Sequence, residues 1–128
     1  MSTGVQARFT FPKEVRLRRR SEFLRVQDRG AKITADCLLC LALPNGRADG
    51  LTRLGLTVSS KVGNAVVRNR IRRCLREVFR VRRSEMPPGF DVVFIARPSA
   101  ANAETPRLTR AFERATQELH KKSVPRSP

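Results

Sequence analysis

The sequence has no tryptophan or tyrosine, a single histidine and three cysteines. It therefore offers few of the side chains that proton transfer or metal binding requires. The three cysteines are too few for a disulfide framework and fit a reducing compartment, so we expect a cytoplasmic location. No apolar run approaches the roughly 18 residues that a membrane-spanning helix needs. The N-terminus also lacks the apolar stretch of a signal peptide, and we expect none.

Acidic residues are scarce as well: eleven Asp and Glu stand against 27 Lys and Arg, which gives a formal net charge of +16. Such an excess destabilises a compact chain through self-repulsion, and it favours a nucleic-acid or anionic-membrane partner. Only five of the basic residues are lysine. Because guanidinium groups hold phosphate through paired hydrogen bonds and stack on bases, the arginine bias favours nucleic acid. A G+C-rich genome would also raise the arginine content.

No pattern of a catalytic or metal site is evident. The acids are scattered singly, and no pair lies beside a histidine at metal-ligand spacing. His120 lies near a polar C-terminal end, where a solvated helix-end residue is expected. Cys37 and Cys40 lie in an apolar run typical of a strand, on which their side chains would point to opposite faces. We interpret both as core cysteines and expect no metal or other cofactor bound by the protein itself.

The strongest pattern is residues 61–83, KVGNAVVRNRIRRCLREVFRVRR, which predict one amphipathic helix. The buried stripe at helical spacing consists of Val67, Ile71, Cys74, Leu75 and Val78. The opposite arc of the helix consists of Asn69, Arg72, Arg73, Arg76, Arg80 and Arg83, flanked by Arg68 and Arg70. Glu77 is the single acid, so the arginines lack the i,i+4 partners of an ordinary solvated helix. A solubilising face would mix both signs, so the pattern favours a polyanion-binding surface.

The remaining residues predict an α+β fold in one domain, 1–128, in the order αβββαβα, with a single-layer mixed sheet of about four strands packed with three helices. The expected elements are a helix over 22–29 after an N-cap at Ser21, a β region over 31–43 broken at Asp36, a strand over 53–59, a central strand over 91–96 and a helix over 108–122. In the first helix we expect Phe23, Leu24 and Val26 to be buried. Residues 1–14 are expected to form an N-terminal arm and 123–128 a frayed tail. Phe9 and Phe11 alternate in the arm, where they either stack on bases or pin the arm to the core.

One stretch resembles a known family. Residues 54–80, LGLTVSSKVGNAVVRNRIRRCLREVFR, are similar to the signature region of the bacterial ribonuclease P protein subunit. RLRRRSEFLRVQDRGAKI (16–33) resembles the first helix of that family, and PPGFDVVFIARPSA (87–100) resembles its last strand. The resemblance spans residues 15–122 and implies a left-handed βαβ crossover, against the general right-handed rule.

The resemblance implies a protein cofactor of a ribozyme that removes the 5′ leader from precursor tRNA, with catalysis by the ribonuclease P RNA and its Mg²⁺ ions. The residues expected to bind that RNA are Lys61, Arg68, Asn69, Arg70, Arg72, Arg73 and Arg76. The residues expected to line a cleft for the single-stranded leader are Phe9, Phe11, Arg16, Phe23, Gln27 and Leu41. Gln27 and Leu41 stand where the family usually has aromatic residues.

Two other functions remain as alternatives. Composition by itself favours a ribosomal or other structural RNA-binding protein without a role in cleavage. A self-sufficient metal-dependent nuclease would need clustered acids, and the scattered ones argue against it.

Overall fold

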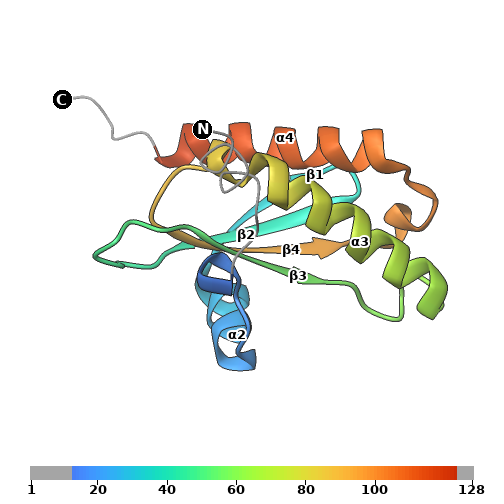
Figure 1. The fold of residues 1–128 in the computed structure, drawn as a ribbon, viewed down its shortest axis with the longest axis horizontal. Helices are drawn as coiled ribbons and strands as arrows, with labels where there is room; N and C mark the ends of the chain where they lie inside the picture. The colour runs from blue at the N-terminus through green and yellow to red at the C-terminus, as the bar shows by residue number, and fades with distance from the viewer. Residues whose placement is uncertain (1–12, 124–128) are drawn as a thin grey trace, which may run out of the picture.

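The computed structural model describes residues 13–123 as one mixed sheet with helices on both of its faces (Figure 1). Its elements are η1 (Lys13–Val15), α2 (Arg20–Arg29), β1 (Ala31–Ala35), β2 (Leu38–Pro44), β3 (Arg53–Thr57), α3 (Ala65–Arg82), η2 (Arg83–Glu85), β4 (Phe90–Ala96), η3 (Pro98–Asn102) and α4 (Thr105–Ser123). This order confirms the predicted α+β fold. Among these residues no helix is long and apolar enough to cross a bilayer.

The sheet has the strand order β1-β2-β4-β3. β1 and β2 form an antiparallel hairpin, and Asp36 in its turn adopts a positive φ of 54°, which confirms the predicted break. β4 is central, as predicted, because it pairs antiparallel with β2 and parallel with β3. Parallel neighbours require a crossover connection, and α3 provides it. The left-handed sense of this crossover stays a prediction.

The helices divide between the two faces of the sheet (Figure 1). α3 and α4 cover one face and share the large core with Leu38 and Cys40 of β2. α2 lies on the other face, where its Val26 packs in a smaller cluster with Leu41 of β2 and Val93 of β4. The side chains of a strand alternate between faces, so β2 is apolar throughout because both of its faces are covered.

Three buried phenylalanines join α3 and α4 to the sheet. The ring centroids of Phe79, Phe94 and Phe112 lie 5.1 to 5.5 Å apart in tilted contacts. Burial of each such ring contributes about 1.5–3 kcal/mol, so this cluster fixes the direction of α3 on the sheet. Phe79 follows Leu75 by one helical turn and extends the predicted stripe.

α3 begins later than predicted. The side-chain oxygen of Asn64 accepts a hydrogen bond from the Val67 N–H at 3.0 Å and caps the helix, which starts at Ala65. Residues 61–64 therefore form a turn, and the prediction of helix from Lys61 was wrong for them.

α2 also differs from its prediction. It begins at Arg20 with Arg19 at the N-cap, not after Ser21, because the Glu22 carboxylate accepts the backbone N–H groups of Arg18 and Arg19 at 3.2 Å each. Val26 is fully buried and Phe23 half-buried, but Leu24 is 47% exposed, so only a narrow stripe of α2 meets the sheet.

The last helix is confirmed, but it begins at Thr105, three residues before the predicted start. Its inward stripe consists of the buried Leu108, Ala111, Phe112, Ala115 and Leu119. Phe9 and Phe11 lie outside the described residues, as do the rest of 1–12 and residues 124–128. The N-terminal arm before Lys13 and the frayed tail after Ser123 therefore stay predictions.

Candidate nucleic-acid interface

The outer face of α3 carries a cationic hollow of about 500 Å³. We call it the α3 hollow; it is lined by Arg16, Asn69, Arg72, Arg73, Arg76, Glu77 and Arg80. Burial of Ile71, Leu75 and Val78 in the core turns this arc toward solvent, as the helical period predicts. Arg16 reaches the hollow from the segment that follows η1, and the sequence pattern of the helix gave no sign of this neighbour.

The arginines of the α3 hollow differ in the hydrogen bonds and ion pairs that their side chains make. Arg73 and Arg76 have no acidic partner among residues 13–123. Arg72 donates hydrogen bonds to the Asn69 side-chain oxygen at 3.0 Å and to the Val58 carbonyl at 3.3 Å, which orient its guanidinium group. Arg80 pairs with Glu77, and this contact lowers the pKa of the carboxyl. The exposed charge of the hollow is therefore mostly uncompensated.

Three residues predicted to bind RNA lie outside the α3 hollow. Lys61 is exposed in the turn before α3. Arg68 donates from its Nε to the Gly63 carbonyl at 3.1 Å, within the same turn. Arg70 points toward η3, where its two terminal nitrogens donate to the carbonyls of Ala101 at 2.7 Å and Ala103 at 2.8 Å. Arg70 thus ties α3 to the segment before α4.

A second hollow, of about 460 Å³, lies between α2 and β3. We call it the α2 hollow; it is lined by Arg18, Arg20, Phe23, Leu24, Gln27 and Thr57. Phe23 and Gln27 were predicted for the leader cleft and are brought together here. Leu41 was predicted for the same cleft but is buried beneath α2, so the structure does not bring it into the hollow. The missing signal was the pairing register, which decides which residue of β2 lies under the helix.

Phe23 rests against β3 at a glycine. A Cβ atom placed on Gly55 would lie 2.7 Å from two atoms of the Phe23 ring, well inside van der Waals contact. Glycine inside a strand often marks such a close approach, and the Arg53–Thr57 strand has it at its centre. Gly55 therefore allows the ring to lie at the border of the α2 hollow.

A third hollow of about 270 Å³ connects the other two along the outer edge of β3. We call it the edge hollow; it is lined by Arg16, Leu17, Arg18, Phe23, Leu54, Gly55, Leu56, Arg76 and Phe79. It shares Arg16 and Arg76 with the α3 hollow, and Arg18 and Phe23 with the α2 hollow. The Leu17 N–H donates to the Leu54 carbonyl at 2.9 Å, which holds this segment on β3. The three hollows form one cationic track.

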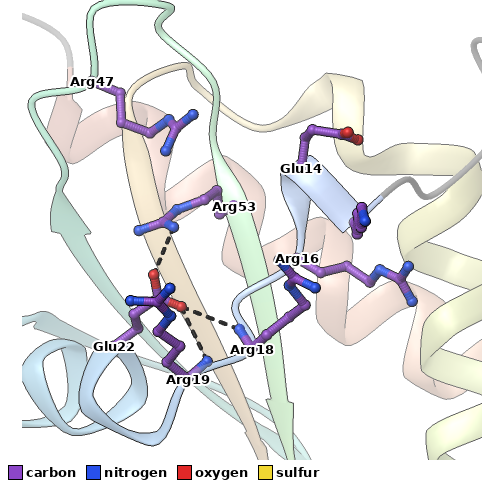
Figure 2. A pocket seen from close by; sticks show the side chains of 8 residues that line it. Glu14, Arg16, Arg18, Arg19, Glu22, Arg47 and Arg53 are labelled. Carbon is purple, nitrogen blue, oxygen red and sulfur yellow. Dashed lines mark hydrogen bonds and ion pairs between the residues drawn. The ribbon is translucent and has the colours of Figure 1, made fainter.

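An arginine network fixes α2 beside this track (Figure 2). Arg53 of β3 donates from Nε and Nη2 to both carboxylate oxygens of the buried Asp91, at 2.9 and 2.7 Å. Its Nη1 donates to Glu22 of α2 at 2.8 Å. The hydrogen bonds to Asp91 raise the pKa of Arg53 above its ordinary value. Burial tends to raise the pKa of Glu22, but hydrogen bonds from two backbone N–H groups and from Arg53 outweigh it and lower that pKa.

The histidine and the cysteines lie outside the linings of the three hollows. Residues 13–123 hold no cluster of three His, Cys, Asp or Glu side chains suited to a metal ion. His120 makes a hydrogen bond of 2.6 Å with the Glu85 carbonyl, at the end of the fold where α4 meets η2. Cys37 and Cys40 are buried core residues, as predicted, and burial raises the pKa of Cys40 to about 12. Cys37 lies in the hairpin turn instead of a strand, so both face the same core and the prediction of opposite faces was wrong.

Comparison with known proteins agrees with this picture. The family model for ribonuclease P matches residues 11–120. The ribonuclease P protein component of Desulfovibrio desulfuricans is 41% identical over 96 residues, or 75% of this chain and 74% of that one. The component of Desulfosudis oleivorans is 40% identical over 115 residues, or 90% of each chain.

Solved structures show the same fold. The RNase P protein of Staphylococcus aureus superposes with a TM-score of 0.72 at 30% identity, over 84% of this chain and 95% of that chain. The RNase P protein of Thermotoga maritima superposes with a TM-score of 0.72 at 29% identity, over 80% of this chain and 96% of that chain. The sequence match over nearly all of the folded residues and the shared architecture together place this chain in the family of ribonuclease P protein components.

Proposed function

We propose that this protein is the RNA-binding, non-catalytic subunit of ribonuclease P and assists removal of the 5′ leader from precursor tRNA. In this proposal hydrolysis belongs to the catalytic RNA and its Mg²⁺ ions. The family supports the assignment to this enzyme. The observation that carries the RNA-binding role is the cationic track, whose Arg73 and Arg76 are exposed and have no acidic partner among the described residues.

The α3 hollow is assigned to the catalytic RNA. Asn69, Arg72, Arg73 and Arg76 lie together on a rigid helix, where guanidinium groups can hold phosphates through paired hydrogen bonds. Arg68 in the first turn of α3 and Lys61 in the turn before it extend this surface at the N-terminal end of the helix. Arg70 contributes by fixing α3 against η3, since both of its terminal nitrogens already donate to backbone carbonyls.

The edge and α2 hollows are assigned to the single-stranded leader. Stacking of one base on an aromatic ring contributes about 1–3 kcal/mol, and Phe23 offers such a ring beside Arg18 and Arg20. Gln27 replaces a second ring with an amide that both donates and accepts hydrogen bonds. Because Arg16 and Arg76 line the edge hollow and the α3 hollow together, a leader in this track would lie directly beside the catalytic RNA.

Reconstitution at low Mg²⁺ tests the proposal. The protein is mixed with a bacterial ribonuclease P RNA and a precursor tRNA that carries a leader, and 5′ cleavage is followed with and without protein. We expect strong stimulation, because neutralising RNA charge substitutes for part of the Mg²⁺ requirement.

Two outcomes would contradict the proposal. Tight binding of both RNAs without any stimulation would favour a ribosomal or other structural RNA-binding protein. Cleavage by the protein in the absence of the catalytic RNA would point to a self-sufficient nuclease.

A further inference from the structure

A fourth hollow, of about 520 Å³, lies where η1, the β2–β3 loop and the start of α2 meet (Figure 2). We call it the η1 hollow; it is lined by Lys13, Glu14, Arg16, Arg18, Arg19, Glu22, Arg47 and Arg53. Six of these eight residues are basic and none is aromatic. This lining differs from that of the α2 hollow, where Phe23 and Leu24 provide apolar surface. The η1 hollow is therefore suited to charge and not to a base.

The floor of the η1 hollow is an arginine held between two carboxylates. Glu22 accepts hydrogen bonds from two backbone N–H groups and from Arg53, as Figure 2 shows. Arg53 also donates to both oxygens of the buried Asp91, through contacts of 2.9 and 2.7 Å. One guanidinium thus lies between two carboxylates, so the positive charge of the hollow comes from its walls and not from its floor.

The walls of the η1 hollow carry a net positive charge, although Glu14 is among them. Within residues 13–123, the side chains of Lys13, Arg18 and Arg19 have no acidic partner. Arg47 is paired with Asp49 through contacts of 3.0 and 2.7 Å, which hold its guanidinium group in place at the loop. Hydrogen bonding to Arg47 lowers the pKa of Asp49 to about 2, so this pair stays ionised at any ordinary pH.

The basic side chains approach the hollow from three separate segments, residues 13–19, the β2–β3 loop and β3 (Figure 2). A phosphodiester backbone carries one charge per nucleotide and suits a long stripe, whereas linked phosphates concentrate several charges in a small volume. Convergent guanidinium and ammonium groups match the second geometry. We propose that the η1 hollow binds a compact oligophosphate of at least three linked phosphate groups, carried by the 5′ end of an RNA or by a free nucleotide.

The position of the hollow fits both sources. It shares Arg16 and Arg18 with the edge hollow, so an RNA strand in the track could place its 5′ end there. With no ring among the described residues of the lining, recognition would be independent of base identity. The proposal concerns binding by the protein itself and stands apart from the role in leader removal.

Calorimetric titration of the full chain with sodium tripolyphosphate at near-physiological salt tests the site. The variant is Lys13→Ala with Arg19→Ala, because both side chains are exposed and neither has an acidic partner within residues 13–123. The control is Arg110→Ala with Arg114→Ala, which removes the same charge from exposed positions on α4, outside all four hollows. We expect one binding site, affinity at least tenfold weaker in the variant and within twofold of the original in the control.

A second titration distinguishes an RNA 5′ end from a free nucleotide as the source of the phosphates. It compares two RNAs of the same sequence, one with a 5′-triphosphate and the other with a 5′-hydroxyl group. Preference for the triphosphate, lost in the variant, assigns the hollow to an RNA end. Equal binding of the two RNAs, with tripolyphosphate binding kept, assigns it to a free nucleotide. The proposal is overturned if variant and control weaken equally, or if tripolyphosphate binds no better than sulfate at matched ionic strength.

Discussion

Two regions of this protein use arginine in opposite ways. On the outer face of α3, Arg73 and Arg76 are exposed and have no acidic partner among the described residues. At the junction of α2, β3 and β4, Arg53 is bonded to two carboxylates, one of them buried. The charge of Arg53 serves the fold, whereas the charge on α3 remains available for a partner. The neighbouring acids, and not the residue type, decide between these roles.

The largest expected effect is on stability, from Arg53→Met. Removing one partner of a buried pair leaves Asp91 uncompensated, which costs about 3–5 kcal/mol. We expect the unfolding midpoint to fall by roughly 10 °C or more in thermal denaturation followed by circular dichroism. Arg25→Met is the matched control, since Arg25 is an exposed residue of α2 outside this network. If both variants melt at the same temperature, the charge of Arg53 does not stabilise the fold, and the contrast between the two regions is wrong.

The next effect is on RNA affinity, from the pair Arg73→Ala and Arg76→Ala. Losing two charge-assisted contacts of about 1.5 kcal/mol each should weaken binding to ribonuclease P RNA about 100-fold at low salt. The slope of log affinity against log salt should flatten by about two, in filter binding over a range of KCl. Stability should stay within about 0.5 kcal/mol of the original. The Arg110→Ala, Arg114→Ala variant removes equal charge from α4 and should bind nearly as the original does. Equal losses in the two variants would mean that net charge, and not the α3 hollow, governs binding.

The smallest expected effect is that of Arg70→Ala. Arg70 belongs to α3, but its guanidinium group is bonded within the fold, so it is intermediate between the two regions. The substitution removes the hydrogen bonds to the Ala101 and Ala103 carbonyls, and we expect a loss of about 2 kcal/mol in urea denaturation. RNA affinity should fall less than in the α3 variant. The opposite result, intact stability with strongly weakened RNA binding, would assign Arg70 to the RNA surface that the family resemblance implies.

The sequence predicts those parts of the interface that lie on one helix. The 3.6-residue period places Asn69, Arg72, Arg73 and Arg76 on a common arc without reference to the rest of the fold. It also places Arg70 at the border of the apolar stripe. It cannot reveal that η3 brings two carbonyls within reach of Arg70, because that contact joins residues more than thirty positions apart.

The parts that escaped prediction depend on pairing between distant segments. The burial of Leu41 follows from the register of β2 and from where α2 crosses it. The Arg53 network joins three elements, and the two acids in it are unremarkable in sequence. The basic residues 16–20 follow one another in the sequence, but they lie along the edge of β3 because Arg16 forms a bridge with Leu54 and Leu17 is buried against the sheet. The local sequence pattern thus predicts which face of a helix or strand a residue lies on, whereas contacts between distant residues are known only from the fold.

The contact between Gly55 and Phe23 has a consequence for how this protein can change over time. A methyl group at position 55 and a phenyl ring at position 23 would occupy the same space, with 2.7 Å between them. Relatives that carry a larger residue in the strand should therefore carry a smaller one on the helix. A side chain at position 55 is thus compatible only with a smaller residue at position 23, although neither position bears a charge.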